Sequence, residues 1–158
     1  MILKIRYKTI EHERTEDAPF MGAVISAIDC KFNCTNCFNQ SLKDQPTLEK
    51  EDIDIIKEIK SNPFNKGIIF GGLEWTLQPT ELFALAGLSH AYDLKTMLYT
   101  GNDFKYLQEY GSIRYLGSYF DYIKCGRYKE ELKTDDNIQY GIKLASNNQH
   151  IYRKDIDY

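Results

Sequence analysis

The sequence predicts a small α/β domain in which parallel strands alternate with helices. Its 158 residues fit one domain, since a domain commonly takes roughly 100 to 200 residues. Hydrophobic residues form 42% and charged residues 27% of the chain, a composition that supports a packed core rather than disorder. Short apolar runs alternate with amphipathic stretches of helical spacing, as in βαβ units. We therefore expect residues 1–158 to form one domain, which begins with a strand and a loop in 1–20.

Several apolar segments have the composition of strands. Leu3, Ile5 and Tyr7 alternate with charged residues, as in a strand with one buried face. The polar stretch that follows, 11–17, predicts a loop. The predicted strands are Leu3–Tyr7, Met21–Ile28, Gly67–Gly72, Lys95–Thr100, Tyr119–Lys124 and Gln139–Leu144.

Three further segments have the apolar spacing of helices. The first is expected to begin at the capping residue Thr47 and to end at 61–63, Ser-Asn-Pro. The second begins at Pro79, which suits a first helical turn. A short third helix contains Phe104 and ends near Gly111. Because these helices connect the strands, we expect parallel pairing, with ligand-binding residues at the carboxyl ends of the strands.

Net charge and hydropathy argue against several classes of partner. Lys and Arg number 20 against 23 Asp and Glu, which gives a net charge of −3, whereas a nucleic-acid-binding surface needs a basic excess to neutralise phosphates. No apolar run reaches the roughly 18 residues of a membrane span, and the charged N-terminus does not fit a secretory signal peptide. We therefore expect a cytoplasmic protein that binds neither nucleic acid nor a membrane.

Three of the four cysteines lie close together, directly after the predicted strand Met21–Ile28. Cys30, Cys34 and Cys37 form a Cys-x3-Cys-x2-Cys motif, and clustered thiols in a reducing compartment commonly bind metal. Thiolates favour zinc, copper(I) or iron-sulfur clusters. A structural zinc ion takes four ligands, whereas a 4Fe-4S cluster held by only three thiolates leaves one iron free to bind another molecule. Three thiolates therefore favour the cluster.

A zinc site is the alternative, because other ligands for zinc are present in the chain. The candidates for a fourth ligand are Cys125, His12, His90 and His150. Cys125 lies in an apolar segment, where cysteine more commonly acts as a small buried side chain. The histidines have neither HxxxH spacing nor a paired carboxylate in the sequence.

The cysteine motif resembles the signature of the radical S-adenosylmethionine superfamily. The residues around the third cysteine indicate one subfamily within this superfamily. Phe38 and Asn39 follow Cys37, which resembles the sequence of the anaerobic ribonucleotide reductase activating proteins. Asn36 precedes it, where those activators commonly carry a small residue and most of the superfamily carries an aromatic one. The motif is therefore most similar to the activators.

Three later segments resemble the activators in the same order. Phe70–Trp75, with the sequence FGGLEW, is similar to the Ser-Gly-Gly-Asp/Glu-Pro segment that receives the amino group of S-adenosylmethionine. Tyr99–Gly101 resembles their Tyr-Thr-Gly at the end of the next strand, and Leu144–Gln149 resembles their C-terminal Gly-Ser-x-Asn-Gln. Two positions depart from the pattern, since Asp29 stands where a glycine usually precedes the first cysteine and Cys125 stands where an aspartate is common.

The resemblance covers about 22–152, the expected core, and implies a fold and two cofactors. The fold would be an incomplete (βα)6 partial barrel of the radical S-adenosylmethionine type, with a 4Fe-4S cluster at the strand ends. Cys30, Cys34 and Cys37 are implied as the cluster ligands. The residues implied in binding S-adenosylmethionine are Asn36, Phe38, Asn39, Gly71, Gly72, Glu74, Thr100, Gly101, Ser146 and Asn148.

The resemblance also implies an activity and partners. The protein would be a radical S-adenosylmethionine oxidoreductase, an activating enzyme that reductively cleaves this cofactor and generates a glycyl radical on the anaerobic ribonucleoside-triphosphate reductase. A reduced flavodoxin or ferredoxin would donate the electron. The short chain leaves little polypeptide to enclose a small substrate, which favours a macromolecular one. The alternatives are a radical enzyme acting on a small molecule, similar to 7-carboxy-7-deazaguanine synthase, and a noncatalytic zinc module.

Overall fold

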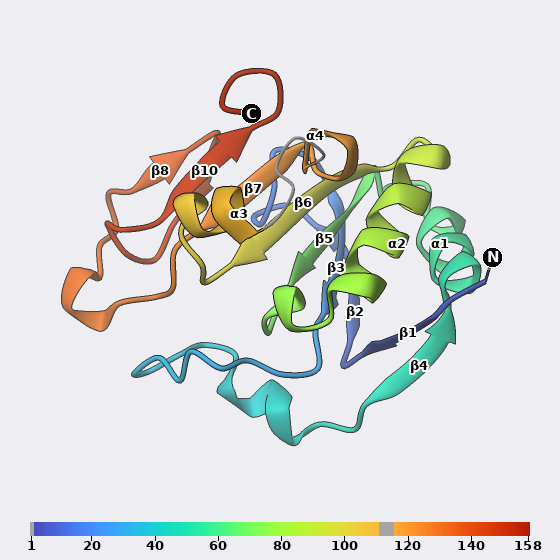
Figure 1. Ribbon diagram of the computed structural model, residues 1–158, viewed down its shortest axis with the longest axis horizontal. Helices are drawn as coiled ribbons and strands as arrows, with labels where there is room; N and C mark the ends of the chain where they lie inside the picture. The colour runs from blue at the N-terminus through green and yellow to red at the C-terminus, as the bar shows by residue number, and fades with distance from the viewer. Residues whose placement is uncertain (1, 111–115) are drawn as a thin grey trace.

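A six-stranded mixed sheet forms the centre of the molecule in the computed structural model, which describes residues 2–110 and 116–158 (Figure 1). Its strands are, in order, β10 (His150–Arg153), β7 (Tyr122–Cys125), β6 (Lys95–Thr100), β5 (Gly67–Gly71), β3 (Gly22–Ser26) and β2 (Ile10–Arg14). The four inner strands run parallel, whereas β10 and β2 pair antiparallel at the two edges. The carboxyl ends of the inner strands therefore share one edge of the sheet.

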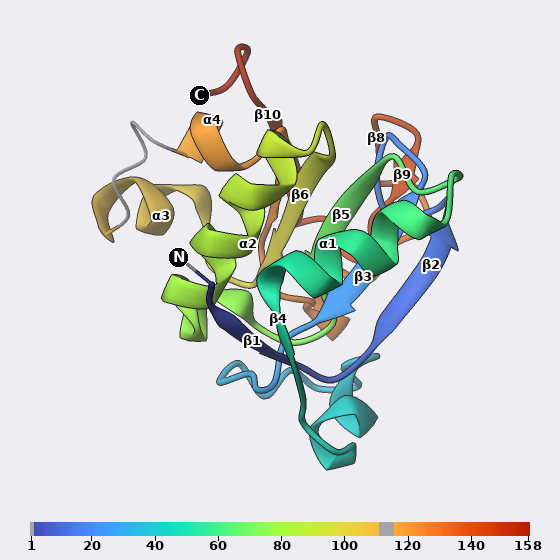
Figure 2. The same cartoon turned by 90° about the vertical axis from the view of Figure 1, so that its right-hand side faces the viewer.

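Helices connect the parallel strands. Among the described residues these are α1 (Asp52–Ser61), α2 (Pro79–Ala91), α3 (Phe104–Tyr110) and α4 (Leu116–Tyr119). α1 and α2 lie side by side over one face of the sheet (Figures 1 and 2). The prediction that the second helix begins at Pro79 is confirmed. Gly111, where the third helix is expected to end, lies outside the described residues, and none of the described helices has both the length and the apolar character to cross a membrane.

The inner strands are buried on both faces of the sheet. On β5, Ile68 and Phe70 belong to the core under α1 and α2, whereas Ile69 contacts a second core with Met97 and Ile151 on the opposite face. Successive residues of a strand point to opposite faces, so burial of both faces requires a continuous apolar run. This requirement explains why β5 contains no polar side chain.

The predicted helix cap at Thr47 is wrong, because the residues after it form a strand. β4 (Leu48–Glu51) pairs antiparallel with β1 (Lys4–Tyr7) in a separate two-stranded sheet, which confirms the predicted N-terminal strand. α1 begins only at Asp52, whose backbone N–H donates to the Leu3 carbonyl at 2.8 Å. Pairing with β1 satisfies the backbone groups of β4, so tertiary contacts outweigh the local helix signal.

The polar stretch 11–17, predicted as a loop, contributes an edge strand instead. β2 begins at Ile10 and pairs antiparallel with β3. Polar side chains suit this position, because an edge strand is partly exposed and its charges discourage pairing with another chain. The register shifts between Glu11 and Arg14, and Glu13 has a φ of 53°. The edge strand is therefore bulged, which a loop-like sequence tolerates.

The C-terminal third of the chain differs most from prediction. Of the predicted strand Tyr119–Lys124, only the part from Tyr122 onward is extended. The predicted strand Gln139–Leu144 is a hairpin of two short strands, β8 (Ile138–Gln139) and β9 (Ile142–Lys143). β10, which was not predicted, pairs with β7. Among the described residues the sheet therefore contains four parallel strands, whereas the resemblance implies six βα units.

A charged network joins α2 to the start of β6. The His90 ring lies 2.9 Å from the Ser118 carbonyl oxygen through Nδ1 and 3.1 Å from Asp121 Oδ2 through Nε2. Both partners accept hydrogen bonds, so the imidazolium form satisfies both contacts. The hydrogen bond to Asp121 raises the pKa of His90. Burial by itself would raise the pKa of Asp121, but hydrogen bonds from His90 and from the Thr96 N–H outweigh burial and lower it.

Replacing His90 with glutamine should lower stability more at low pH than at high pH. Because the folded protein raises the pKa of His90, its contribution is complete below the unfolded value of about 6.5 and is lost as the pH rises through the folded value. We expect His90→Gln to cost about 1 kcal/mol near pH 6 and to lower Tm there by roughly 2–4 °C. Thermal unfolding of both proteins at a series of pH values measures the difference. Parallel pH curves would mean that His90 is not charged in the folded protein.

Candidate functional site

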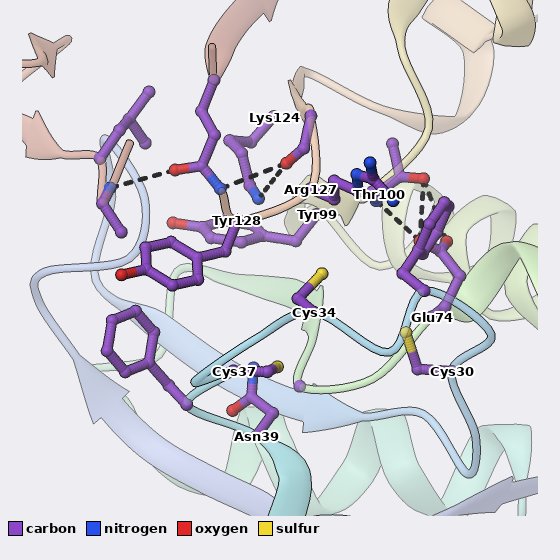
Figure 3. A pocket seen from close by; sticks show the side chains of 18 of the residues that line it. Cys30, Cys34, Cys37, Asn39, Glu74, Tyr99, Thr100, Lys124, Arg127 and Tyr128 are labelled. Atoms are coloured by element: carbon purple, nitrogen blue, oxygen red, sulfur yellow. Dashed lines mark hydrogen bonds between the residues drawn. The ribbon is translucent and has the colours of Figure 1, made fainter. Parts of the chain in front are cut away.

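A cavity of about 300 Å³ opens at the carboxyl ends of the parallel strands (Figure 3). The cysteine loop, 30–37, forms one side of it, and residues from 72–74, 99–101 and 124–128 form the other. These three segments contain or follow the ends of β5, β6 and β7. The parallel order of the strands brings their ends together, and such ends are the usual position of a ligand site in a sheet of this kind.

Cys30, Cys34 and Cys37 all line this cavity and are partly buried. Figure 3 shows their side chains around the same space. The loop turns where the Cys37 N–H donates to the Cys34 carbonyl at 3.2 Å. Asn33 and Asn36 have φ values of 49° and 56°, a left-handed conformation that asparagine adopts more readily than most residues. Asn36 therefore has a backbone role in this turn, which explains an asparagine before the third cysteine.

The three thiols surround the cavity without converging on one point. Within residues 2–110 and 116–158, no three Cys, His, Asp or Glu side chains are arranged to hold a single metal ion. A zinc ion about 2.3 Å from each sulfur would need the sulfurs only about 4 Å apart, whereas a four-iron cluster is larger. The donor set fits an iron-sulfur cluster. The candidates for a fourth zinc ligand, Cys125, His12, His90 and His150, do not line this cavity.

Asp29 fixes the start of the cysteine loop. Its side chain accepts a hydrogen bond from the Cys30 N–H at 2.7 Å, and its carbonyl accepts one from the Glu74 N–H at 2.8 Å. The second bond ties the loop to the segment that follows β5. The aspartate that stands in place of the expected glycine therefore supports the loop through both its side chain and its backbone.

Glu74 is buried, yet it lines the cavity. Its carboxylate accepts hydrogen bonds from the Thr76 N–H and hydroxyl, the Thr100 hydroxyl and the Gly101 N–H, at 2.7–3.2 Å. A carboxylate has about four acceptor positions, so these four donors occupy all the acceptor positions of Glu74. Asn102 supports both threonines, because its Nδ2 lies 3.0 Å from each hydroxyl oxygen. Glu74 therefore joins the end of β5 to the end of β6.

Lys124 lines the same cavity from the end of β7. Its ammonium lies 4.9 Å from the centre of the Tyr99 ring and 3.3 Å from the Gly126 carbonyl oxygen. The Tyr99 hydroxyl donates to the Asp17 carbonyl at 2.5 Å, which fixes the ring under the ammonium. Burial lowers the pKa of Lys124, although the neighbouring Cys125 and Glu74 oppose this effect.

Burial also controls the ionisation of the thiols. It raises the pKa of Cys30 and of Cys34. The charges of Arg127 and Lys124 oppose the shift at Cys34. Metal coordination requires the thiolate, so the positive side chains on this wall of the cavity favour the form of the sulfur that a cluster needs.

The C-terminal motif 144–149 braces the wall of the cavity that follows β7. The Gln149 side-chain oxygen accepts from two N–H groups of its own turn at 3.0 and 3.2 Å, and its Nε2 donates to the Gly126 carbonyl at 3.2 Å. The Asn148 Nδ2 donates to the Arg127 carbonyl at 2.8 Å. The two amides therefore hold the backbone of 126–127 in position.

The structure brings most of the predicted S-adenosylmethionine-binding residues together. Phe38, Asn39, Gly72, Glu74, Thr100 and Gly101 line the cavity with the cysteines. Gly71 lines a neighbouring cavity of about 360 Å³, and Asn148 lines another of about 410 Å³. Asn36 and Ser146 do not line the cavity that contains the cysteines. Asn36 is exposed at a turn, and Ser146 is fully buried against Asn148. Their role in binding stays a prediction.

Sequence reasoning missed Lys124, Arg127 and Tyr128, which line the cavity at the end of β7. The ring centres of Tyr128 and Phe38 are 5.1 Å apart, so an aromatic contact joins this segment to the end of the cysteine loop. The signal that could have found these residues is their position, because ligands collect at the carboxyl ends of parallel strands.

A family model described as a 4Fe-4S single cluster domain matches residues 21–152. The matched segment contains the three cysteines, Glu74 and the C-terminal motif 144–149. No curated protein matches the chain.

Adding a methyl group at Gly101 should displace the cysteine loop. A Cβ atom there would lie 2.6 Å from two ring carbons of Phe32, and Phe32 stands between Cys30 and Cys34 in the chain. Gly101→Ala should therefore lower the iron content of anaerobically reconstituted protein and cost about 1 kcal/mol or more in stability. Iron and sulfide per chain, together with thermal unfolding, measure the two effects.

Gly71→Ala is the matched control at the end of the neighbouring strand. A Cβ atom there would have its nearest neighbours at 3.7–4.0 Å, which is ordinary contact, so iron content should stay normal. Equal iron content in the two variants would show that Phe32 moves aside without shifting the loop.

Proposed function

This chain belongs to the 4Fe-4S single cluster domain family, and we propose that it is a radical S-adenosylmethionine activase. The proposed activity is reductive cleavage of S-adenosylmethionine, with generation of a glycyl radical on an anaerobic ribonucleoside-triphosphate reductase. One observation carries the proposal. Cys30, Cys34, Cys37 and Glu74 line a single cavity at the ends of parallel strands.

The three cysteines of the loop would hold the cluster. Three thiolates leave one iron without a protein ligand, and the remaining cysteine, Cys125, is buried within β7 and does not line the cavity. The cluster and S-adenosylmethionine, when bound together, supply one-electron cleavage of a carbon-sulfur bond. The residues of this chain would position both groups and limit the access of water.

Glu74 would bind the ammonium of the methionine part of the cofactor. Its carboxylate is buried, so a charge-assisted hydrogen bond there would be screened little by solvent. Because its acceptor positions are filled, the ligand would take the position of a hydroxyl donor, from Thr76 or Thr100, and hydroxyls rotate freely. Gly72 is required at the turn before Glu74, because its φ of 75° suits glycine and a Cβ atom there would lie 2.4 Å from Ser26 Oγ.

The proposal of a protein substrate is supported by the open rim of the cavity. Phe38 lies on this rim next to Tyr128, and 69% of Phe38 is exposed. A docked reductase would cover this aromatic surface and exclude water from the cavity. A reduced flavodoxin or ferredoxin would supply the electron.

Formation of a glycyl radical tests the proposed activity. Reconstituted protein, S-adenosylmethionine, a one-electron reductant and the cognate reductase should give a doublet electron paramagnetic resonance signal, which collapses when the glycine carries deuterium at its α-carbon. Cys34→Ala should abolish both the iron content and the signal. Cys125→Ala is the matched control and should keep both, because Cys125 lies within the sheet.

Two outcomes would contradict the proposal in different ways. Cofactor cleavage on a small molecule, with no glycyl signal in any cognate reductase mixture, would assign a different substrate. If the anaerobically purified protein contains zinc instead of iron, the proposal of an iron-sulfur cluster is wrong.

Glu74→Gln should weaken S-adenosylmethionine binding by about 10- to 100-fold while the cluster stays intact. The substitution keeps the shape of the side chain but removes its charge, and a hydrogen bond to a charged group is worth roughly 1.5–3 kcal/mol. Calorimetric titration under anaerobic conditions measures the affinity.

Glu81→Gln is the control for neutralising a buried carboxylate. Glu81 is also buried, but it binds the Arg6 guanidinium at 2.5 and 3.1 Å and does not line the cavity. This variant should lose stability and keep its affinity for the cofactor. Unchanged affinity in Glu74→Gln would mean that Glu74 only joins the two strand ends.

A further inference from the structure

Lys124 carries a charge that the proposed function does not use. The residue is only 8% exposed and lines the cavity from β7. Figure 3 shows Lys124, Tyr99 and Cys34 around the same cavity. A charged side chain this deeply buried normally has a partner of opposite charge.

Lys124 has weaker compensation than Lys8, the other buried lysine among the described residues. The Lys8 ammonium donates to the carbonyls of Lys43 and Gln45, at 3.3 and 2.5 Å. Lys124 has one carbonyl contact, with Gly126 at 3.3 Å, and the face of a tyrosine ring at 4.9 Å. An uncompensated buried ammonium is costly. The cavity is therefore where a negative charge would stabilise it.

The cysteine loop is the source of that negative charge. The acceptor positions of the Glu74 carboxylate are occupied by other donors. Cys34 and Cys37, in contrast, line the cavity and would become thiolates on binding iron. A cluster on three thiolates is an anion, and it gains a further negative charge when it accepts an electron. We propose that Lys124 is the counter-charge of the reduced cluster and raises its reduction potential.

The physical basis is Coulomb's law in a medium of low polarity. The interaction between two charges grows as the effective dielectric constant falls, and buried charges are screened little by salt. Cluster potentials respond to nearby charge and to solvent exposure. The inference rests on the cluster binding proposed above, but it concerns a residue that is not one of the cluster ligands.

Lys124→Met tests the inference, because it keeps an unbranched side chain of similar length and removes the charge. Reconstituted protein without S-adenosylmethionine is titrated with one-electron mediators, and the signal of the reduced cluster gives the midpoint potential. At a fixed solution potential we expect the ratio of reduced to oxidised cluster to fall about tenfold, a shift of about 59 mV for one electron. Lys124→Arg, which keeps the charge, should stay close to the parent protein.

Lys143→Met is the matched control. Lys143 also lines the cavity, but its side chain is 61% exposed and its ammonium lies 3.1 Å from Asp135. Removal of a hydrated and paired charge should move the potential much less than Lys124→Met does. Equal shifts in the two variants would overturn the proposal, because burial would then have no effect.

Two further measurements separate this role from others. Lys124→Met should keep its iron content and Tm, because it removes a buried charge without breaking an ion pair. A large loss of Tm would give Lys124 a structural role, and an unchanged potential with weaker S-adenosylmethionine binding would assign it to the ligand carboxylate. Either result overturns the proposal. Absence of iron from the parent protein would contradict the proposed function itself, and iron analysis detects that separately.

Discussion

The geometry of the cavity depends on the hydrogen bonds that the buried carboxylate of Glu74 accepts. It accepts from groups of Thr76, Thr100 and Gly101, so it holds the segment after β5 against the end of β6. The backbone N–H of the same residue donates to the Asp29 carbonyl, which precedes the first cysteine. One residue therefore sets the distance between two strand ends and the cysteine loop. A buried carboxylate needs this many donors, because an unsatisfied charge in the interior is costly.

Opposite charges lie at the two ends of the cavity wall that the strand ends form. Glu74 follows β5, whereas Lys124 and Arg127 stand at the end of β7, with β6 between these strands. Parallel strand order creates this separation, since each strand contributes the residues at its carboxyl end to the same edge of the sheet. A cavity of this kind suits a ligand that carries both charges, and its positive end would also stabilise the proposed anionic cluster.

The edges of the sheet stabilise this arrangement without entering the site. β2 and β10 cover the two outer strands of the parallel group by antiparallel pairing. The segment before β10 carries the amides of Asn148 and Gln149, which hold the backbone after β7. The C-terminal motif therefore has a structural function in the wall of the cavity, whatever part it takes in binding a ligand.

Local sequence determined a substantial part of this protein. The grouping of the three cysteines at one cavity, the start of α2 at Pro79 and the buried strand β5 follow from spacing, from the fixed φ of proline and from a continuous apolar run. These features depend on residues within a few positions of each other, so no knowledge of strand pairing is needed. The resemblance to the activating proteins added Glu74, which lies at the cavity as expected.

Tertiary structure alone decided the remainder. The residues after Thr47 form a strand because β1 pairs with them, and the polar residues of β2 are extended because β3 offers a free edge. Lys124 lines the same cavity as the cysteine loop, about 90 positions earlier in the chain, only because β7 takes its position beside β6. Such contacts depend on which strands are neighbours and on the register of their pairing. The physical reason is that the free energy of strand pairing comes from residues distant in the sequence, and a local sequence pattern does not encode those partners.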